Sequence, residues 1–234
     1  MDQSLNGIDF QEGAVLLFDK PLDWTSFDLV NKVRWLLCKK LHIKKLKVGH
    51  AGTLDPKATG LVIVCTGKAT KTIDSLQAEE KEYIATLKLG ATTPSYDLEK
   101  EEDKTYPTEH ITPELVQEKL KTFTGEIDQV PPIFSAIKVD GKRAFEFARK
   151  GNDPLLDARK ITLCSIEVVR FEMPELVLRI NCSKGTYIRS LARDLGESLG
   201  SGAYLTGLIR TKSGAKMLEN AFTIEKFEKS LALI

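Results

Sequence analysis

The sequence predicts an α+β fold with a mixed, mainly antiparallel sheet, and three observations support this prediction. Segments with strand-like and helix-like patterns are interspersed along the chain, without the regular alternation of a βαβ protein. Several predicted strands are separated only by short turns, as antiparallel neighbours are. The 234 residues, of which 42% are hydrophobic and 29% charged, are enough to bury a substantial core.

The first half of the chain contains one clear helix and two clear strands. Apolar residues recur at helical spacing over 26–41, and Thr25 followed by Asp28 has the form of a capping box, so we predict a helix there. Residues 61–65 form a short apolar run between two glycines, which is typical of a strand buried on both faces. Residues 82–89 mix β-branched and aromatic side chains and end at a glycine, which indicates another strand.

The second half of the chain contains helices marked by a proline at the start or a glycine beyond the end, and strands rich in β-branched residues. The segments that we predict are a helix over 112–123, a strand over 134–139, a short helix over 143–150, strands over 161–171 and 176–182, and a helix over 187–199. There is no repeat or long linker, and residues 212–234 form only a short tail.

The composition argues against several classes of protein. No apolar run is long enough for a membrane span, and residues 1–11 lack the order of a secretory signal, so we expect a cytoplasmic protein without membrane contact. The four cysteines are widely spaced, and with the three histidines they give no zinc-ligand spacing, which favours buried reduced thiols and no metal. Neither phosphate-loop pattern of nucleotide-binding proteins is present.

Basic residues are concentrated between Asp28 and Asp55, although the whole chain is nearly neutral, with 34 basic and 33 acidic residues. No acidic residue lies between these two aspartates. The basic residues there are Lys32, Arg34, Lys39, Lys40, Lys44, Lys45 and Lys47. Such a segment can bind a nucleic-acid backbone, or it can be a solvated helix face, and the sequence by itself leaves both interpretations open.

The loop around Asp55 is the strongest candidate for a functional site. Gly49 and Gly52 precede the carboxylate, and Pro56 follows it directly. Glycine allows close backbone approach, and proline restricts both its own φ and the residue before it, so this loop can present one carboxylate rigidly. The alternative is a helix N-cap at Asp55 with Pro56 at the first helical position, which the spacing alone favours.

Several longer motifs stand in a fixed order along the chain. They are KPLDWTS at 20–26, GHAGTLDPKATG at 49–60, KEY at 81–83 with LG at 89–90, a segment from VPP to GKR at 130–143, and CSKGTYIRSLARDLG at 182–196. In this order they resemble the motifs of the bacterial tRNA pseudouridine-55 synthases of the TruB type, over about residues 13–211. The resemblance implies a pseudouridine synthase fold, with a catalytic domain over 1–211 and an RNA-gripping insertion at about 104–160.

The resemblance also implies an activity, the isomerisation of uridine to pseudouridine in the T loop of tRNA, by base flipping and without a cofactor. The reaction breaks the bond between N1 and the ribose, turns the base and rejoins it through C5, so it needs neither a redox change nor an external atom. The implied partner is the T-arm of tRNA, and we expect the protein to be a monomer. Many family members carry a C-terminal PUA-type RNA-binding domain, for which residues 212–234 are too few.

Three residues match the catalytic positions of the family. Asp55 matches the nucleophile, and it can form an adduct with the base or the sugar or remove a ribose proton, a choice that the sequence leaves open. Arg189 would keep this carboxylate ionised. Tyr83 would stack on the flipped uracil and accept the proton from C5. Without the resemblance, a surface ion pair and a half-buried aromatic would account for Arg189 and Tyr83.

Further residues match positions that contact or shape the substrate. His50 would wedge into the T loop, Tyr187 would support the pocket, Leu208 would line it, and Lys20 would shape the site beside Asp55. Gly52 and Thr53 belong to the same motif as Asp55. Without the resemblance, a buried histidine with satisfied hydrogen bonds would account for His50, and ordinary core packing would account for Leu208.

One departure and two alternatives accompany this hypothesis. Where the family often has Thr-Asp-Thr before a second aspartate, this chain has residues 91–96 before Asp97, so one acid is missing. A non-catalytic RNA-binding or tRNA-folding module on the same scaffold would not need Asp55. A guide-RNA-dependent relative is disfavoured, because the sequence has no long basic tail and too few residues after 211 for the further domain.

Overall fold

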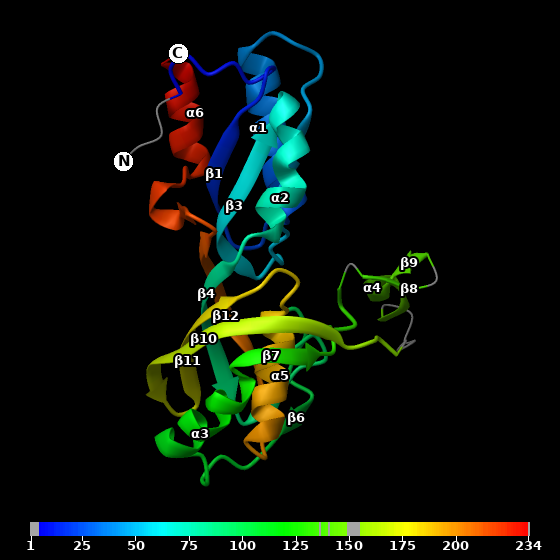
Figure 1. Ribbon diagram of the computed structural model, residues 1–234, viewed down its shortest axis with the longest axis vertical. Helices are drawn as coiled ribbons and strands as arrows, with labels where there is room; N and C mark the ends of the chain where they lie inside the picture. The colour runs from blue at the N-terminus through cyan, green and yellow to red at the C-terminus, as the bar shows by residue number, and fades with distance from the viewer. Residues whose placement is uncertain (1–4, 136, 140, 149–154, 234) are drawn as a thin grey trace. The chain divides into compact units, whose positions relative to one another are not determined.

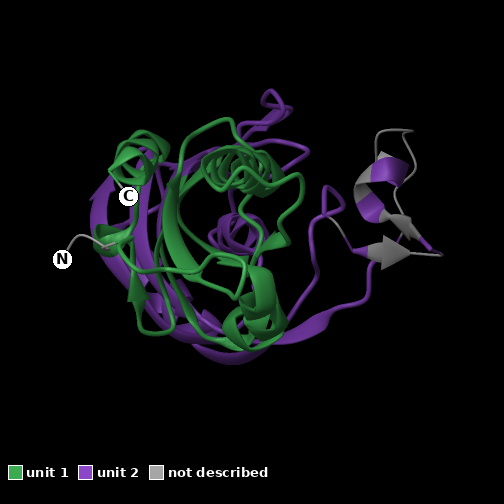
Figure 2. Cartoon of the chain, turned by 90° about the horizontal axis from the view of Figure 1, so that it is seen from above, with its two compact units in different colours: residues 1–83, 208–234 green, residues 84–207 purple. Residues whose placement is uncertain are grey.

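The computed structural model describes residues 5–135, 137–139, 141–148 and 155–233. The chain forms two compact units, which Figure 2 shows in different colours. Unit 1 comprises residues 1–83 and 208–234, and unit 2 comprises residues 84–207. The chain therefore passes from one unit to the other twice, once within strand β4 (Lys81–Leu89) and once within strand β12 (Ala203–Ser213).

Unit 1 is built around the sheet order β1-β3-β12-β4 (Figure 1). Strand β3 (Ala58–Thr66) pairs antiparallel with β1 (Val15–Lys20) and β2 (Val48–His50), and parallel with β12. The parallel pair brings Arg210 of β12 opposite Gly60 of β3. A short strand, β13 (Lys216–Met217), pairs with the end of β12. Because β3 pairs along both edges and is almost continuously apolar, nearly all of its residues are buried.

The helices of unit 1 are α1, α2 and α6, and two short 3₁₀ segments accompany them. Their bounds are α1 Ser26–Lys40, α2 Ile73–Ala78, α6 Ile224–Ala232, η1 Gly67–Thr72 and η2 Leu218–Asn220. Helix α1 begins at the predicted capping box, in which the side chains of Thr25 and Asp28 satisfy each other's backbone N–H groups. Helix α6 packs through Phe227 against Phe18 of β1, with ring centroids 4.9 Å apart.

Unit 2 continues with the strand order β12-β4-β11-β10-β7, in which β10 pairs antiparallel with β11 and β7. Its larger elements are β7 Gly125–Gln129, β10 Arg159–Glu172, β11 Glu175–Cys182, α3 Pro113–Phe123 and α5 Ile188–Ser198. Its short elements are β5 Ala91–Thr92, β6 Lys104–Thr105, β8 Lys138–Val139, β9 Lys142–Arg143 and α4 Ala144–Ala148. Helix α5 presents an apolar face that includes Leu191 and Leu195, both of which are buried.

The α+β class and most of the predicted elements are confirmed. The helices predicted over 26–41, 112–123 and 187–199 are α1, α3 and α5, and the four clear strands are β3, β4, β10 and β11. The strand predicted over 134–139 is wrong at 134–135, because the chain bends where Ser135 N–H donates to the Ile133 carbonyl, 2.8 Å away, and position 136 lies outside the described residues. The short helix predicted over 143–150 occupies 144–148, and its last two positions, 149 and 150, lie outside the described residues.

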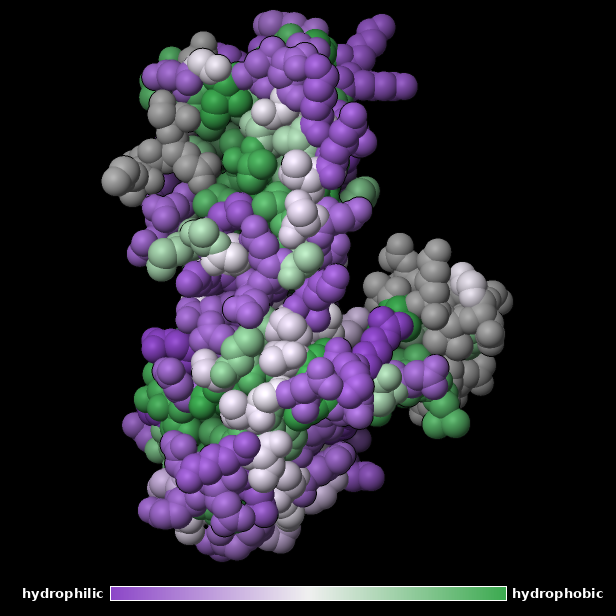
Figure 3. Space-filling view, in the orientation of Figure 1, coloured by the Kyte–Doolittle hydropathy of each residue, from purple (hydrophilic) through white to green (hydrophobic). Residues whose placement is uncertain are grey.

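The surface of the described residues is mainly hydrophilic on the face seen in Figure 3, as the charged fraction of 29% leads one to expect. Hydrophilic side chains cover much of the described surface there, and apolar residues form smaller areas among them. Within the described ranges, no helix combines the length and the apolar character that crossing a bilayer requires. Cys65 and Cys182 are buried as expected, but Cys164 is exposed, at a solvent-facing position of β10.

Candidate active site

Asp55 lies in unit 1, in the loop that connects β2 to β3, and its side chain is half-buried. The backbone turns directly after it, where Ala58 N–H donates to the Asp55 carbonyl at 3.1 Å, and β3 begins at Ala58. The alternative in which Asp55 caps a helix is therefore wrong. Local spacing favoured a helix cap, but the chain from Ala58 onward is extended because it pairs with β1 on one side and β12 on the other.

Helix α1 holds the residue immediately before Asp55. The Ser26 hydroxyl accepts a hydrogen bond from Leu54 N–H at 2.8 Å and donates one to the Leu54 carbonyl at 3.1 Å. Both Ser26 and Leu54 are buried, so no water competes for these two backbone groups. Because Ser26 is the first residue of α1, the start of the helix and the Asp55 loop are fixed to each other.

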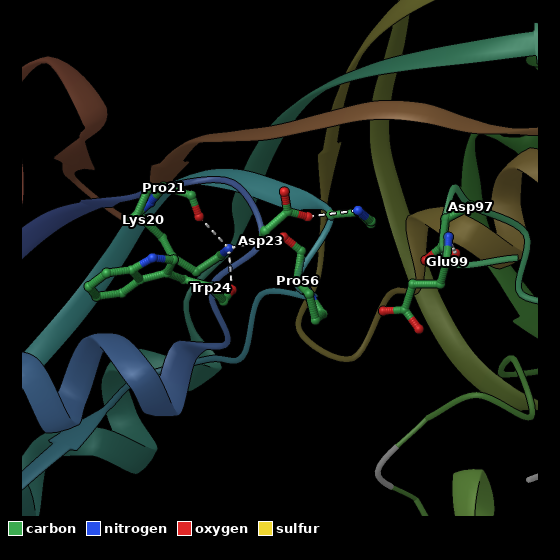
Figure 4. Close-up of polar contacts among 8 residues, drawn as sticks. Lys20, Pro21, Asp23, Trp24, Pro56, Asp97 and Glu99 are labelled. Carbon is green, nitrogen blue, oxygen red and sulfur yellow. Dashed lines mark hydrogen bonds and ion pairs between the residues drawn. The ribbon is translucent and has the colours of Figure 1, made fainter.

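Lys20 holds the other side of the loop. This lysine is completely buried at the end of β1, and its Nζ donates to the carbonyls of Pro21 at 2.9 Å, Trp24 at 2.6 Å and Pro56 at 3.4 Å (Figure 4). Asp23 N–H donates to the same Pro56 carbonyl at 2.9 Å. The KPLDWTS motif thus packs its backbone against the residue that follows Asp55.

The Lys20 ammonium also sets the electrostatics of the loop. Burial lowers the pKa of Lys20 to about 8, and the attraction of Asp55 and three further aspartates limits this decrease. At neutral pH the amine therefore remains mostly protonated and contributes a positive charge close to the Asp55 carboxylate. A buried cation with backbone carbonyls as partners is consistent with the shaping role that the resemblance implies for Lys20.

Arg210 is a residue of the site that the sequence analysis missed. Its guanidinium is buried and donates through Nε to the Leu61 carbonyl at 2.7 Å, through one terminal nitrogen to Gly52 at 3.1 Å, and through the other to Thr53 at 3.5 Å. One signal could have found it, because Arg210 stands two residues after Leu208 and strand periodicity places both on one face. Thr53 itself is exposed.

Three more predicted residues lie in unit 1. His50 ends β2, and burial lowers the pKa of its imidazole, which is therefore neutral at pH 7. Tyr83 is buried on β4, and Leu208 is half-buried on β12 opposite Ala58 of β3.

The other two predicted residues lie in unit 2, Arg189 in helix α5 and Tyr187 directly before it. Arg189 is buried, and its terminal nitrogens donate to the carbonyls of Ser95 at 3.3 Å and Phe134 at 2.9 Å. Its Nε lies 3.6 Å from Oδ2 of Asp97, the aspartate that matches the family's second acid. Asp97 is buried as well and accepts a hydrogen bond from Glu99 N–H at 2.9 Å (Figure 4).

Tyr187 precedes α5 and is fixed through its backbone. The side-chain amide of Gln129, at the end of β7, accepts from Tyr187 N–H at 2.9 Å and donates to the Tyr187 carbonyl at 3.1 Å. The Ser190 hydroxyl donates to the Val130 carbonyl at 2.8 Å. These contacts fix the first turn of the helix that carries Arg189, and the sequence analysis did not identify Gln129.

Seven of the nine predicted residues thus belong to one unit of the chain. Unit 1 contains Lys20, His50, Gly52, Thr53, Asp55, Tyr83 and Leu208. Arg189 and Tyr187 belong to unit 2, so the predicted pairing of Arg189 with Asp55 stays a prediction. Within the described part of the chain, no group of three or more histidine, cysteine and carboxylate side chains could hold a metal ion.

Comparison with solved structures indicates the class of the protein. A chain of a crystal structure titled as a Cbf5-Nop10-Gar1 complex aligns with a TM-score of 0.70 and 31% identity, over 94% of this chain and 54% of that one. A structure titled as an H/ACA RNP bound to a substrate RNA containing 2'-deoxyuridine gives 0.67 and 29%, over 94% and 53%. This chain spans about half the length of each of these two chains, and the shared fold indicates the class of the pseudouridine synthases.

The family model described as TruB family pseudouridylate synthase (N terminal domain) matches residues 39–188. A protein of Phocaeicola vulgatus named tRNA pseudouridine synthase B is 62% identical, over 96% of this chain and 95% of its own length. A protein of Flavobacterium johnsoniae with the same name is 56% identical, over 95% and 98%. The chain therefore belongs to the TruB family of pseudouridylate synthases.

Proposed function

We propose that the protein isomerises uridine to pseudouridine at position 55 in the T loop of tRNA, with Asp55 as the nucleophile. The observation that carries this proposal is the loop around Asp55, in which backbone groups on both sides of the carboxylate are held by buried side chains. Ser26 holds Leu54, Lys20 holds Pro56, and Arg210 holds the two residues before Leu54. A nucleophile must be fixed in this way to reach one atom of a flipped nucleotide.

The carboxylate can begin the reaction by one of three routes. It can add to the uracil ring, it can displace the base from the ribose, or it can remove a ribose proton, and each route leads to cleavage of the bond between N1 and the sugar. The freed uracil then turns and bonds through C5, and the proton on C5 is released. Tyr83 is proposed to stack on the base and to accept this proton, and Arg189 to face the Asp55 carboxylate.

The energetics favour a substrate whose target base is already loosely held. Extruding a base costs a few kcal/mol, and stacking it on one aromatic ring returns about 1–3 kcal/mol. Stacking on Tyr83 can therefore offset the cost of extruding the base, but hardly more than that. A loop nucleotide with partly exposed bases meets this condition better than a base inside a duplex.

The remaining grip on the RNA is proposed to come from two basic segments. Residues 32–47 carry seven positive charges without an acid among them, and they lead directly into β2 and the Asp55 loop. The second segment, 135–150, lies partly outside the described residues. Contacts of this kind go mainly to phosphates, so they position the RNA while the pocket selects the base. We further propose that the protein acts in the cytoplasm as a monomer.

The test uses unmodified tRNA that carries tritium at C5 of uridine, because isomerisation releases this label. The wild-type protein should release it, and Asp55→Asn should bind the tRNA with similar affinity and release none. Asp74→Asn, an exposed carboxylate of α2, is the matched control and should retain activity.

Equal release by Asp55→Asn and the wild type would remove the nucleophile assignment. Binding without release by either protein would instead favour the non-catalytic RNA-binding module.

A further inference from the structure

Arg210 is a buried cation whose described partners are all backbone carbonyl oxygens. Its side chain lies in a strand, only 2% of its surface is exposed, and its three hydrogen bonds go to Leu61, Gly52 and Thr53. Within the described residues it forms no ion pair, so its charge is not neutralised by a carboxylate there. Burying a guanidinium without a carboxylate partner costs free energy, and an apolar side chain could fill the same position in the strand without this cost.

The hydrogen bonds to Gly52 and Thr53 are unusual for consecutive residues. In an extended chain successive carbonyls point to opposite sides, so two that meet one guanidinium require a turn between them. The backbone makes this turn at Gly52, which has a φ of +100°. The fork of Arg donors matches two such acceptors at once, and a lysine ammonium, as a point charge, does not reproduce this geometry.

Close packing of the strands brings Arg210 to this position. Gly60 of β3 lies opposite both Lys20 of β1 and Arg210 of β12. A Cβ on Gly60 would collide with the backbone of Arg210, so only glycine admits β12 at this distance. The two cations therefore enter from the strands on either side of one glycine, and they hold opposite ends of the Asp55 loop.

We propose that Arg210 is a positioning residue for the isomerisation: by fixing the carbonyls of Gly52 and Thr53 it sets the direction in which the Asp55 carboxylate points. This inference rests on the proposed function, because it assigns a role only if Asp55 is the reacting group. Lys20 restrains the chain after Asp55 and cannot replace Arg210, whose contacts lie two and three residues before Asp55.

The experiment compares Arg210→Met and Arg210→Lys with the wild type in single-turnover tritium release, with enzyme in saturating excess over tRNA. Arg210→Met should lower the rate about 100-fold, the loss typical of a reacting group displaced by about 1 Å. Arg210→Lys keeps the charge but has a single donor nitrogen in place of the planar fork, and it should recover part of that loss. The dissociation constant for tRNA should change less than threefold in both.

Thr211→Val is the matched control, because it removes a hydrogen bond of the same strand, from Thr211 Oγ1 to Glu82 Oε1 at 2.7 Å, without touching the loop. It should lower the melting temperature and leave the rate at saturation unchanged. The proposal is overturned if Arg210→Met loses no more rate than Thr211→Val at equal folded fraction, or if its defect lies only in tRNA binding. If Asp55→Asn still releases tritium, the proposed function fails first and independently of Arg210.

Discussion

Lys20 illustrates how a single buried charge contributes to the site. Its ammonium satisfies three backbone carbonyls that no strand or helix serves, and it does so from a position with no exposed surface. Burial makes the charged form less favourable, which is why its pKa decreases to about 8. The residue therefore holds the conformation of two loops and places a positive charge near Asp55.

The lowered pKa makes a prediction about stability. Between pH 8 and 10.5 the unfolded chain still binds the Lys20 proton whereas the folded chain has released it, so the free energy of unfolding rises with pH in this window. We expect the wild type to gain stability relative to Lys20→Met as the pH is raised from 8 to 10, by at most about 1.4 kcal/mol per pH unit. Urea unfolding of both proteins across this range measures the difference, and a constant difference would contradict the lowered pKa.

At the scale of elements, the start of helix α5 depends on a side chain of strand β7. Tyr187 occupies the N-cap position of this helix, and no side-chain hydrogen bond caps it. The Gln129 amide instead binds both backbone groups of Tyr187, and Gln129 is itself buried. Arg189 is the second residue of the helix, so its placement depends on this contact.

Gln129→Leu should leave both Tyr187 backbone groups without their partner and destabilise the protein by about 1–3 kcal/mol. It should also slow tritium release at saturating enzyme, because the first turn of the helix that carries Arg189 would be held less firmly. Asn181→Leu is the matched control, since among the described residues its amide donates only to the Ser165 hydroxyl, at 3.0 Å, and its removal leaves no backbone group there unpaired. Thermal unfolding and single-turnover rates measure both effects. Equal losses in the two variants would show that the contact with Tyr187 has no special role.

At the scale of the whole molecule, the chain is nearly neutral, but residues 32–47 carry seven positive charges and no acid. The loop after α1 is fixed by the buried side chain of Leu46 and by a hydrogen bond from Gly67 N–H to the Lys47 carbonyl at 2.8 Å. Lys44, Lys45 and Lys47 are exposed on this loop. No ion pair in the described part of the chain involves these three lysines, so their charge is available to a polyanion.

Replacing Lys44, Lys45 and Lys47 together by glutamine should weaken tRNA binding and reduce its dependence on salt. Each lost phosphate contact lowers the slope of log K against log salt by about 0.7–0.9, so a decrease of about 2 is expected if most of the three contact phosphate. The rate at saturating enzyme should not change. Lys121, Lys226 and Lys229 are also exposed, and their triple glutamine variant is a control with the same change in charge. Equal effects in both variants would indicate a general charge effect without a specific contact.

Local sequence signals predicted the parts of the fold that depend on neighbours along the chain. The capping box at Thr25 and the apolar periodicity of α1 operate within a few residues, and the short apolar run of β3 is similarly local. The local pattern of glycines and proline already indicated the Asp55 loop, and the family motifs added its role as a nucleophile and added Arg189 as a candidate. The same local rules failed at Asp55 itself, where a cap and a strand entry have similar sequences and the partners of β3 decide between them.

The sequence by itself determined that this is a pseudouridine synthase of the TruB type, because several long motifs in one order identify it. Only the tertiary structure decided how Asp55 is held. Ser26, Lys20 and Arg210 come from a helix and two strands, and Arg210 lies 149 positions from one of its partners, Leu61. Contacts at such separations arise from strand pairing and close packing at Gly60, and no pattern of adjacent residues records them.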